Sequence, residues 1–338
     1  MARLKTVSMW VFVVGVVLGG IVVGRDMLPR FADAGGAVAV AVPIIGVAAA
    51  LVAVIIAALD RSRLHVPAAW ALAFAWGAVG ACGLALEING IASDAVNDVL
   101  DDPGATHWGA ALIGPLDEEA VKGVGIALLL VVYRDRIRRP LQGFALGAFA
   151  GLGFQVVENV SYAVTFALRD AQSDVTGALT VSILRALFGF QSHWVYSGLF
   201  GLGLILLSRA HVRARNRIAL GAAAVALAFV LHFFWNAPSG ENPIVTVLLL
   251  MVKCGLTLAI LAGAWTWMLF EQRRWLAWAA HTPEGMRLAP AAELATLPTR
   301  ALRRNAERYI AYYYGPATAE VARERQTWLI RELTLRAA

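Results

Sequence analysis

The sequence predicts an all-α polytopic membrane protein, with about eight transmembrane helices followed by a helical cytoplasmic tail. Hydrophobic residues fill 59% of its 338 positions and charged residues only 15%, whereas soluble domains average about 45–50% and about 25%. Apolar runs of roughly 20 residues, the length that crosses a bilayer core of about 30 Å, recur along the chain. Backbone groups in lipid must hydrogen-bond within their own segment, so we expect these runs to be helices.

The apolar runs define eight expected spans. They cover roughly residues 8–24, 36–59, 68–93, 109–133, 141–168, 177–208, 217–237 and 243–270. The first run lacks the small-residue cleavage site of a signal peptide, so we interpret it as an uncleaved span. The sixth range is long for one straight crossing, and we expect its first turns to lie outside the hydrocarbon.

Basic residues in the connecting segments predict the orientation. If eight helices alternate in direction, one side carries the basic N-terminus and the segments "DRSRLH", "RDRIRR", "RAHVRARNR" and "EQRR". The opposite segments, such as "RDAQSDV" and "PSGEN", carry less positive charge. Because Lys and Arg concentrate in cytoplasmic loops, we expect a multi-pass protein of the cell membrane with both termini cytoplasmic. The net charge of +6 is gathered in these short blocks, and it does not indicate a nucleic-acid partner.

The composition changes after the last apolar run. We therefore divide the chain into a transmembrane helical domain, residues 1–270, and a cytoplasmic tail, residues 271–338. Segments such as "TRALRRNAERYIAYYYG" have helical spacing with mixed charge. We expect the tail to pack on the membrane face or on a partner, and nothing in it indicates catalysis.

Ionisable residues inside the expected fourth span are the first indication of function. Each such group costs at least about 2.5–3.5 kcal/mol in a membrane helix, so it usually marks a function or a paired charge. Glu118 and Lys122 are four residues apart and share a helix face, whereas Glu119 points about 100° away. A structural ion pair with a spare acid is one interpretation. We favour the other, in which a carboxylate serves as a general base.

The next three expected spans repeat this pattern of polar residues one helical turn apart. The residues concerned are Phe154, Glu158 and Asn159, then His193 and Ser197, then His232 and Asn236. Taken singly, each group has a structural explanation, such as a buried histidine with its hydrogen bonds satisfied. Together they predict a polar cavity within one leaflet. Counted in residues from the end of its span, His193 lies deeper in the membrane than the others, unless its span starts later than residue 177. Three further in-span charges, Glu87, Arg185 and Lys253, stay unassigned.

The residue types indicate hydrolysis by an activated water. Glu, His and Asn occur without the surroundings of a Ser or Cys nucleophile. A glutamate, assisted by a histidine, can take a proton from water, and a second histidine with an asparagine can donate to the oxyanion that forms. We therefore expect cleavage of a peptide bond in or near the membrane.

Four ordered motifs carry a family resemblance. "EEAVK", "FQVVEN", "HWVYSG" and "HFFWN" resemble the motifs EExxK, FxxxE, HxxxS/G and HxxxN of PrsW-family intramembrane proteases. That family is related to the CAAX prenyl endopeptidases and to bacterial abortive-infection (ABI) membrane proteins. The resemblance covers about residues 109–240, and no motif covers the first three spans or the tail.

The resemblance implies a glutamic-type endopeptidase that acts on membrane-anchored proteins, in some members on an anti-sigma factor. It implies that Glu118 and Glu119 activate water, that His193 assists, and that Glu158 orients or tunes the site. It also implies that His232 and Asn236 stabilise the oxyanion. Lys122, Phe154, Asn159 and Ser197 would support these groups.

Three alternatives remain open from the sequence. Zinc bound by Glu158, His193 and His232 is one, since two histidines and a glutamate can leave a fourth position open. The HExxH signature is absent and the related prenyl endopeptidases are taken to work without metal, so we expect no cofactor. A proton- or ion-coupled transporter also places acids and histidines in spans, but no inverted repeat is visible. The third is a scaffold whose tail recruits partners.

Overall fold

The fold is all-α, as the sequence predicts. We used a computed structural model that describes residues 2–60, 65–99, 103–169, 174–208, 214–240 and 242–336. Within these ranges the chain forms helices and no strands. In order they are α1 (Ala2–Asp33), α2 (Gly35–Leu59), α3 (Pro67–Ala75), the π-helix η1 (Trp76–Ala81), α4 (Cys82–Val99), α5 (Pro103–Val132), α6 (Pro140–Ala167), α7 (Asp174–Leu187), α8 (His193–Ser208), α9 (Ala214–Asn236), α10 (Pro243–Ala279), α11 (Pro283–Leu288), α12 (Ala291–Leu294), α13 (Arg300–Tyr314) and α14 (Pro316–Arg336).

Six helical segments in the described residues are long and apolar enough to cross a membrane. They are α1, α2, the continuous stretch 67–92, α6, residues 216–236 of α9, and α10. This supports a multi-pass membrane protein. Three further helices of the described residues, α5, α7 and α8, lie among these spans without being both long and apolar enough. α5 carries the charges of the EExxK motif, α7 has 14 residues and α8 has 16.

The expected sixth span, residues 177–208, is wrong as a single helix. The chain forms α7 up to Leu187 and starts α8 only at His193. Gly189 has a low helix propensity, and Ser192 immediately before α8 is a residue type favoured at helix starts. The break therefore falls where the sequence weakens the helix. It also explains the depth of His193, which begins its helix instead of lying far along it.

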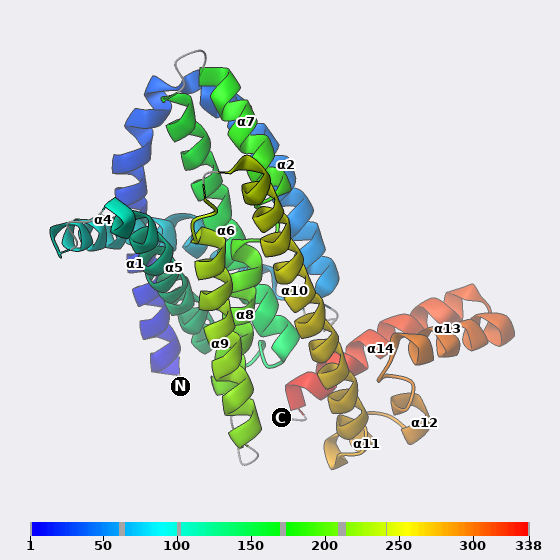
Figure 1. The fold of residues 1–338 in the computed structure, drawn as a ribbon. Helices are drawn as coiled ribbons and strands as arrows, with labels where there is room; N and C mark the ends of the chain where they lie inside the picture. The colour runs from blue at the N-terminus through cyan, green and yellow to red at the C-terminus, as the bar shows by residue number, and fades with distance from the viewer. Residues whose placement is uncertain are drawn as a thin grey trace.

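α6 is the central helix of the membrane part, and most of its residues are buried. Figure 1 shows it surrounded by neighbouring helices, among them α2, α7 and α8. Its glycines at 143, 147 and 151 recur every fourth residue on the side that faces α8. A Cβ atom on Gly147 or Gly151 would overlap the backbone carbonyl of Ser197 or His193. These glycines let the two helices approach closely, as small residues do in membrane bundles.

The C-terminal helices form a separate hydrophobic cluster around the end of α10. Figure 1 shows α13 and α14 extending sideways from that end, away from the membrane helices. The cluster buries apolar side chains of α10 and of the helices after it: Leu276, Ala279, Leu294, Leu297, Leu329, Ile330 and Leu333. α10 runs through the expected domain boundary at residue 270, and the division into 1–270 and 271–338 stays a prediction.

Candidate active site

A buried group of acidic, basic and imidazole side chains lies where α5, α6, α8 and α9 meet. Its centre consists of five residues, which we call the acid–histidine cluster: Glu118, Glu119, Lys122, His193 and His232. All five are at most 7% exposed. The structure therefore brings together residues from three of the four motifs in one buried cluster, and Glu158 of the remaining motif borders it.

Glu119 accepts hydrogen bonds at both of its carboxylate oxygens. Its Oε1 accepts from Lys122 Nζ at 2.6 Å and lies 3.1 Å from His232 Nδ1. Its Oε2 accepts from Ser197 Oγ at 2.9 Å. A carboxylate with three donors is held firmly as an anion, and it has little capacity left to act on a substrate. Glu119 therefore holds the side chains of Lys122 and His232 in place.

Each histidine contacts one carboxylate, Glu119 or Glu158, through one ring nitrogen, and its other ring nitrogen faces Glu118. His232 places Nδ1 on Glu119 and Nε2 at 3.6 Å from Glu118 Oε2. His193 places Nε2 at 3.0 Å from Glu158 Oε2 and Nδ1 at 3.9 Å from Glu118 Oε2. An ionised carboxylate can only accept, so the nitrogens facing Glu119 and Glu158 carry the protons. The nitrogens facing Glu118 are left with lone pairs.

Lys122 gives independent support for this proton assignment at His193. Its Nζ lies 3.1 Å from His193 Nδ1, and an ammonium group can only donate. His193 Nδ1 must then be the acceptor, which again leaves the proton on Nε2. The same ammonium lies 3.7 Å from Glu118 Oε2 and 4.1 Å from the centre of the Phe154 ring. Phe154 therefore covers the charged end of Lys122 with an aromatic face.

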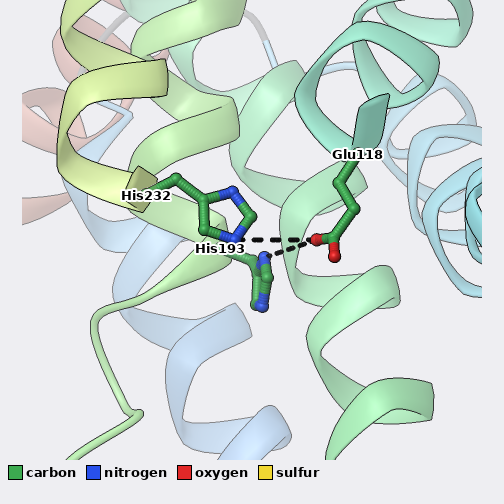
Figure 2. A group of neighbouring side chains, drawn as sticks. All are labelled: Glu118, His193 and His232. Carbon is green, nitrogen blue, oxygen red and sulfur yellow. Dashed lines mark ion pairs between the residues drawn. The ribbon is translucent and has the colours of Figure 1, made fainter. Parts of the chain in front are cut away.

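Glu118 is the acid without a hydrogen bond at its inner oxygen. Figure 2 shows its carboxylate pointing toward both imidazole rings. Oε2 is buried and has no hydrogen-bond partner within the described residues. One ligand atom from each of Glu118, His193 and His232 lies within 4.8 Å of the others. Buried polar atoms are rarely left without a hydrogen bond, and a carboxylate oxygen facing two imidazole acceptor nitrogens is a set of ligands that could hold a cation.

The remaining predicted residues lie around this centre. Asn159 does not face the cluster; its side-chain oxygen accepts a hydrogen bond from Arg185. Asn236 is exposed at the end of α9, one turn beyond His232. A Cβ atom built on Gly114 would lie 3.4 Å from Asn236 Nδ2 and 3.5 Å from Glu118 Oε1. Gly114 thus leaves room for about one atom between the Asn236 amide and the outer oxygen of Glu118.

Two residues in contact with the site were given no role in it from the sequence. Arg185 of α7 pairs with Glu158, and its guanidinium lies 4.1 Å from the centre of the Tyr162 ring. Tyr196 stacks on His232 with ring centres 5.3 Å apart. The sequence could have indicated Arg185, because it is a charged residue inside an expected span. It could not have indicated Tyr196, because aromatic residues are common in the core of apolar helices.

The other in-span charges lie outside the cluster. Glu87 of α4 pairs with Arg25 of α1. Lys253 of α10 donates to the backbone oxygens of Trp235 and Ala237 at 3.0 and 2.7 Å. These carbonyls lie at the C-terminal end of α9, where carbonyl groups lack helical partners. Lys253 therefore fixes the end of the helix that carries His232.

Comparison with known proteins agrees with the motifs. A family model described as PrsW family intramembrane metalloprotease matches residues 66–266, which is more than half of the chain. The match contains the whole motif region and extends beyond it into α3. No curated protein and no solved structure matched. A peptidase is thereby favoured over the transporter and the scaffold. The chain belongs to the PrsW family of intramembrane metalloproteases, and its activity is that of an intramembrane peptidase.

Proposed function

We propose that the protein hydrolyses peptide bonds of membrane-anchored proteins at the acid–histidine cluster, with a divalent metal held by Glu118, His193 and His232. One observation carries the proposal: one ligand atom each of Glu118, His193 and His232 lies within 4.8 Å of the others, and the Glu118 oxygen has no hydrogen bond within the described residues. His193 Nδ1, which accepts from Lys122, would exchange that contact for the metal. Three protein ligands with an open fourth position are typical of catalytic zinc sites. The family description points in the same direction.

The proposal departs from our sequence-based expectation of catalysis without a metal. It also differs from the zinc site considered from the sequence, because the carboxylate ligand is Glu118 instead of Glu158. Glu158 is engaged by Arg185 and by His193 Nε2. Metal-binding histidines usually donate a hydrogen bond from their second ring N–H to a carboxylate, which fixes the orientation of the ring. Glu158 and Glu119 stand in that position behind His193 and His232.

The residues of the cluster divide the chemical work. A bound divalent ion would supply Lewis acidity toward a peptide carbonyl and a water molecule. The outer oxygen of Glu118, on the side of Gly114, is placed to take the proton of an attacking water. The exposed Asn236 amide can donate to the substrate carbonyl at the same opening. Glu119 keeps the ammonium of Lys122 beside Glu118, where it offsets negative charge that forms during attack.

The metal can be tested separately from activity. We expect the purified wild-type protein to contain about one zinc or similar ion per chain, and His232→Ala to lose most of it. Glu87→Gln is a matched control, because it removes a membrane-embedded glutamate outside the cluster. Metal absent from wild-type protein purified without chelator, together with activity that chelators do not change, would overturn the metal assignment.

The substrate can be found with a census of new protein N-termini. Membranes and medium are compared between cells with wild-type protein and cells with Glu118→Gln at matched abundance. We expect termini near membrane anchors that vanish in the variant and persist in the Glu87→Gln control. The family resemblance makes an anti-sigma factor the first substrate to inspect. Identical termini in all three strains would contradict proteolysis under those conditions.

A further inference from the structure

A cavity lies away from the acid–histidine cluster, at the junction of the membrane helices and the C-terminal helices. Its volume is about 440 Å³. It is enclosed by the end of α2, the second half of α10, and parts of the tail around α13 and α14. In Figure 1 this junction lies beside the lower end of α2, where the tail helices leave α10. We call it the junction cavity.

The junction cavity lies at the level of one membrane surface. α2 ends at Leu59, and the backbone oxygen of Leu59 accepts a hydrogen bond from Trp265 Nε1 of α10 at 3.1 Å. Tryptophan is enriched at membrane–water interfaces, where the indole N–H can hydrogen-bond beside an apolar ring. His65, which precedes α3, also lines the cavity. In our expected orientation this surface is the cytoplasmic one.

The lining is basic on the side of the tail. Arg273, Arg300 and Arg303 contribute to it, against a single acid, Asp60. Arg273 and Arg300 are exposed and have no ion-pair partner within the described part of the chain. Arg303 is 9% exposed, and its Nη1 donates to the backbone oxygen of Leu297. Guanidinium groups match the geometry of a phosphate with paired N–H donors, so this side of the cavity fits a phosphate.

The lining is apolar on the side of the membrane. Ala57, Ala58 and Leu269 contribute to it. The exposed face of α2 continues from Ala58 into the membrane through Val54, which is 64% exposed, and Leu51, which is 56% exposed. An acyl chain can follow this face while its phosphate stays among the arginines. A free anion would use only the basic half of such a cavity.

We propose that the junction cavity binds the phosphate headgroup of an acidic phospholipid from the leaflet on the side of the tail. The lipid then connects α2, α10 and α13, and holds the C-terminal helices at the bilayer surface. Anionic lipids attract basic segments at the cytoplasmic surface in general, but a cavity with apolar and basic halves adds a defined site. The proposal does not depend on the peptidase mechanism.

The test uses the full-length protein in lipid nanodiscs with two matched pairs of substitutions. Arg273→Gln with Arg300→Gln removes two lining charges. Arg274→Gln with Arg304→Gln removes two neighbouring exposed charges that do not line the cavity. Nanodiscs contain phosphatidylcholine alone or mixed with phosphatidylglycerol, and inorganic phosphate is added in a third arm. Thermal unfolding and retained lipid, by native mass spectrometry, are measured in each.

We expect phosphatidylglycerol to stabilise wild-type and control proteins and to be retained by both, with retention at least tenfold lower in the lining variant. Equal lipid responses of the lining and control variants would overturn the proposal in favour of general surface attraction. Stabilisation by inorganic phosphate alone would overturn it in favour of a free-anion site. If the lining variant is unstable in phosphatidylcholine, Arg273→Gln alone replaces it, since that exposed side chain has no ion-pair partner within the described ranges.

Discussion

At the scale of single residues, the two adjacent glutamates of the EExxK motif have different surroundings. Glu119 receives three hydrogen bonds, whereas the inner oxygen of Glu118 receives none. The sequence could not separate their roles, because spacing along a helix does not tell which neighbours the other helices bring. The expected pairing of Glu118 with Lys122 is present at 3.7 Å, but Glu119 is the closer partner at 2.6 Å.

The first prediction concerns Arg185 and its effect on metal binding. Its guanidinium holds Glu158, which in turn fixes His193. We expect Arg185→Gln to lower metal affinity by about 10–100-fold, the usual effect of losing a group behind a metal ligand. Arg185→Lys keeps the positive charge but has no second N–H group to donate to Asn159. We therefore expect its metal affinity to lie between those of the wild-type protein and Arg185→Gln. Competition with a zinc chelator measures this, and equal affinities of all three proteins would contradict it.

Ser197→Ala gives a milder prediction. The substitution removes one of three hydrogen bonds to Glu119 and leaves those from Lys122 and His232. A single hydrogen bond contributes about 0.5–1.5 kcal/mol, so turnover should fall by roughly tenfold or less. The measurement is the turnover of a reporter substrate by Ser197→Ala, compared with that of the wild-type protein and of Glu118→Gln. A loss as complete as that of Glu118→Gln would mean that Ser197 contacts the substrate itself.

At the scale of elements, the apolar runs predicted most spans, whereas the break before α8 and the contact of α7 with α6 depended on tertiary structure. The expected span 177–208 is mostly apolar on both sides of Gly189, so hydropathy alone placed α7 and α8 in one span, although the polar residues Gln191 and Ser192 lie at the break. Placing His193 at the start of α8 brings it beside Glu158 and His232. α7 matters because Arg185, near its end, reaches α6.

Gly151→Ala tests the contact between α6 and α8. The added Cβ atom would overlap the backbone oxygen of His193, so the two helices must separate and His193 must move. We expect lower thermal stability and weaker metal binding. Gly255→Ala on α10 is the control, because no atom lies within 4 Å of its added Cβ. Wild-type metal affinity in Gly151→Ala would show that the close approach does not position His193.

At the scale of the whole molecule, the membrane helices and the tail have separate hydrophobic clusters joined by α10. The composition change near residue 270 predicted a division there, but it could not predict that α10 continues to Ala279 and shares its last turns with the tail. Local hydropathy predicts where the membrane-embedded part of a helix ends. The end of a helix depends on what packs against it after it leaves the membrane.

Leu329→Ala tests whether the tail is an independent unit. Leu329 is fully buried in the cluster around the end of α10, and removing such a side chain costs about 2–5 kcal/mol. If the two clusters are independent, limited proteolysis should cut the tail of the variant sooner, while metal content and turnover stay at wild-type values. Arg331→Ala, on the exposed side of the same helix, controls for changes at the surface. Loss of metal in Leu329→Ala would instead show that packing of the tail reaches through α10 to the acid–histidine cluster.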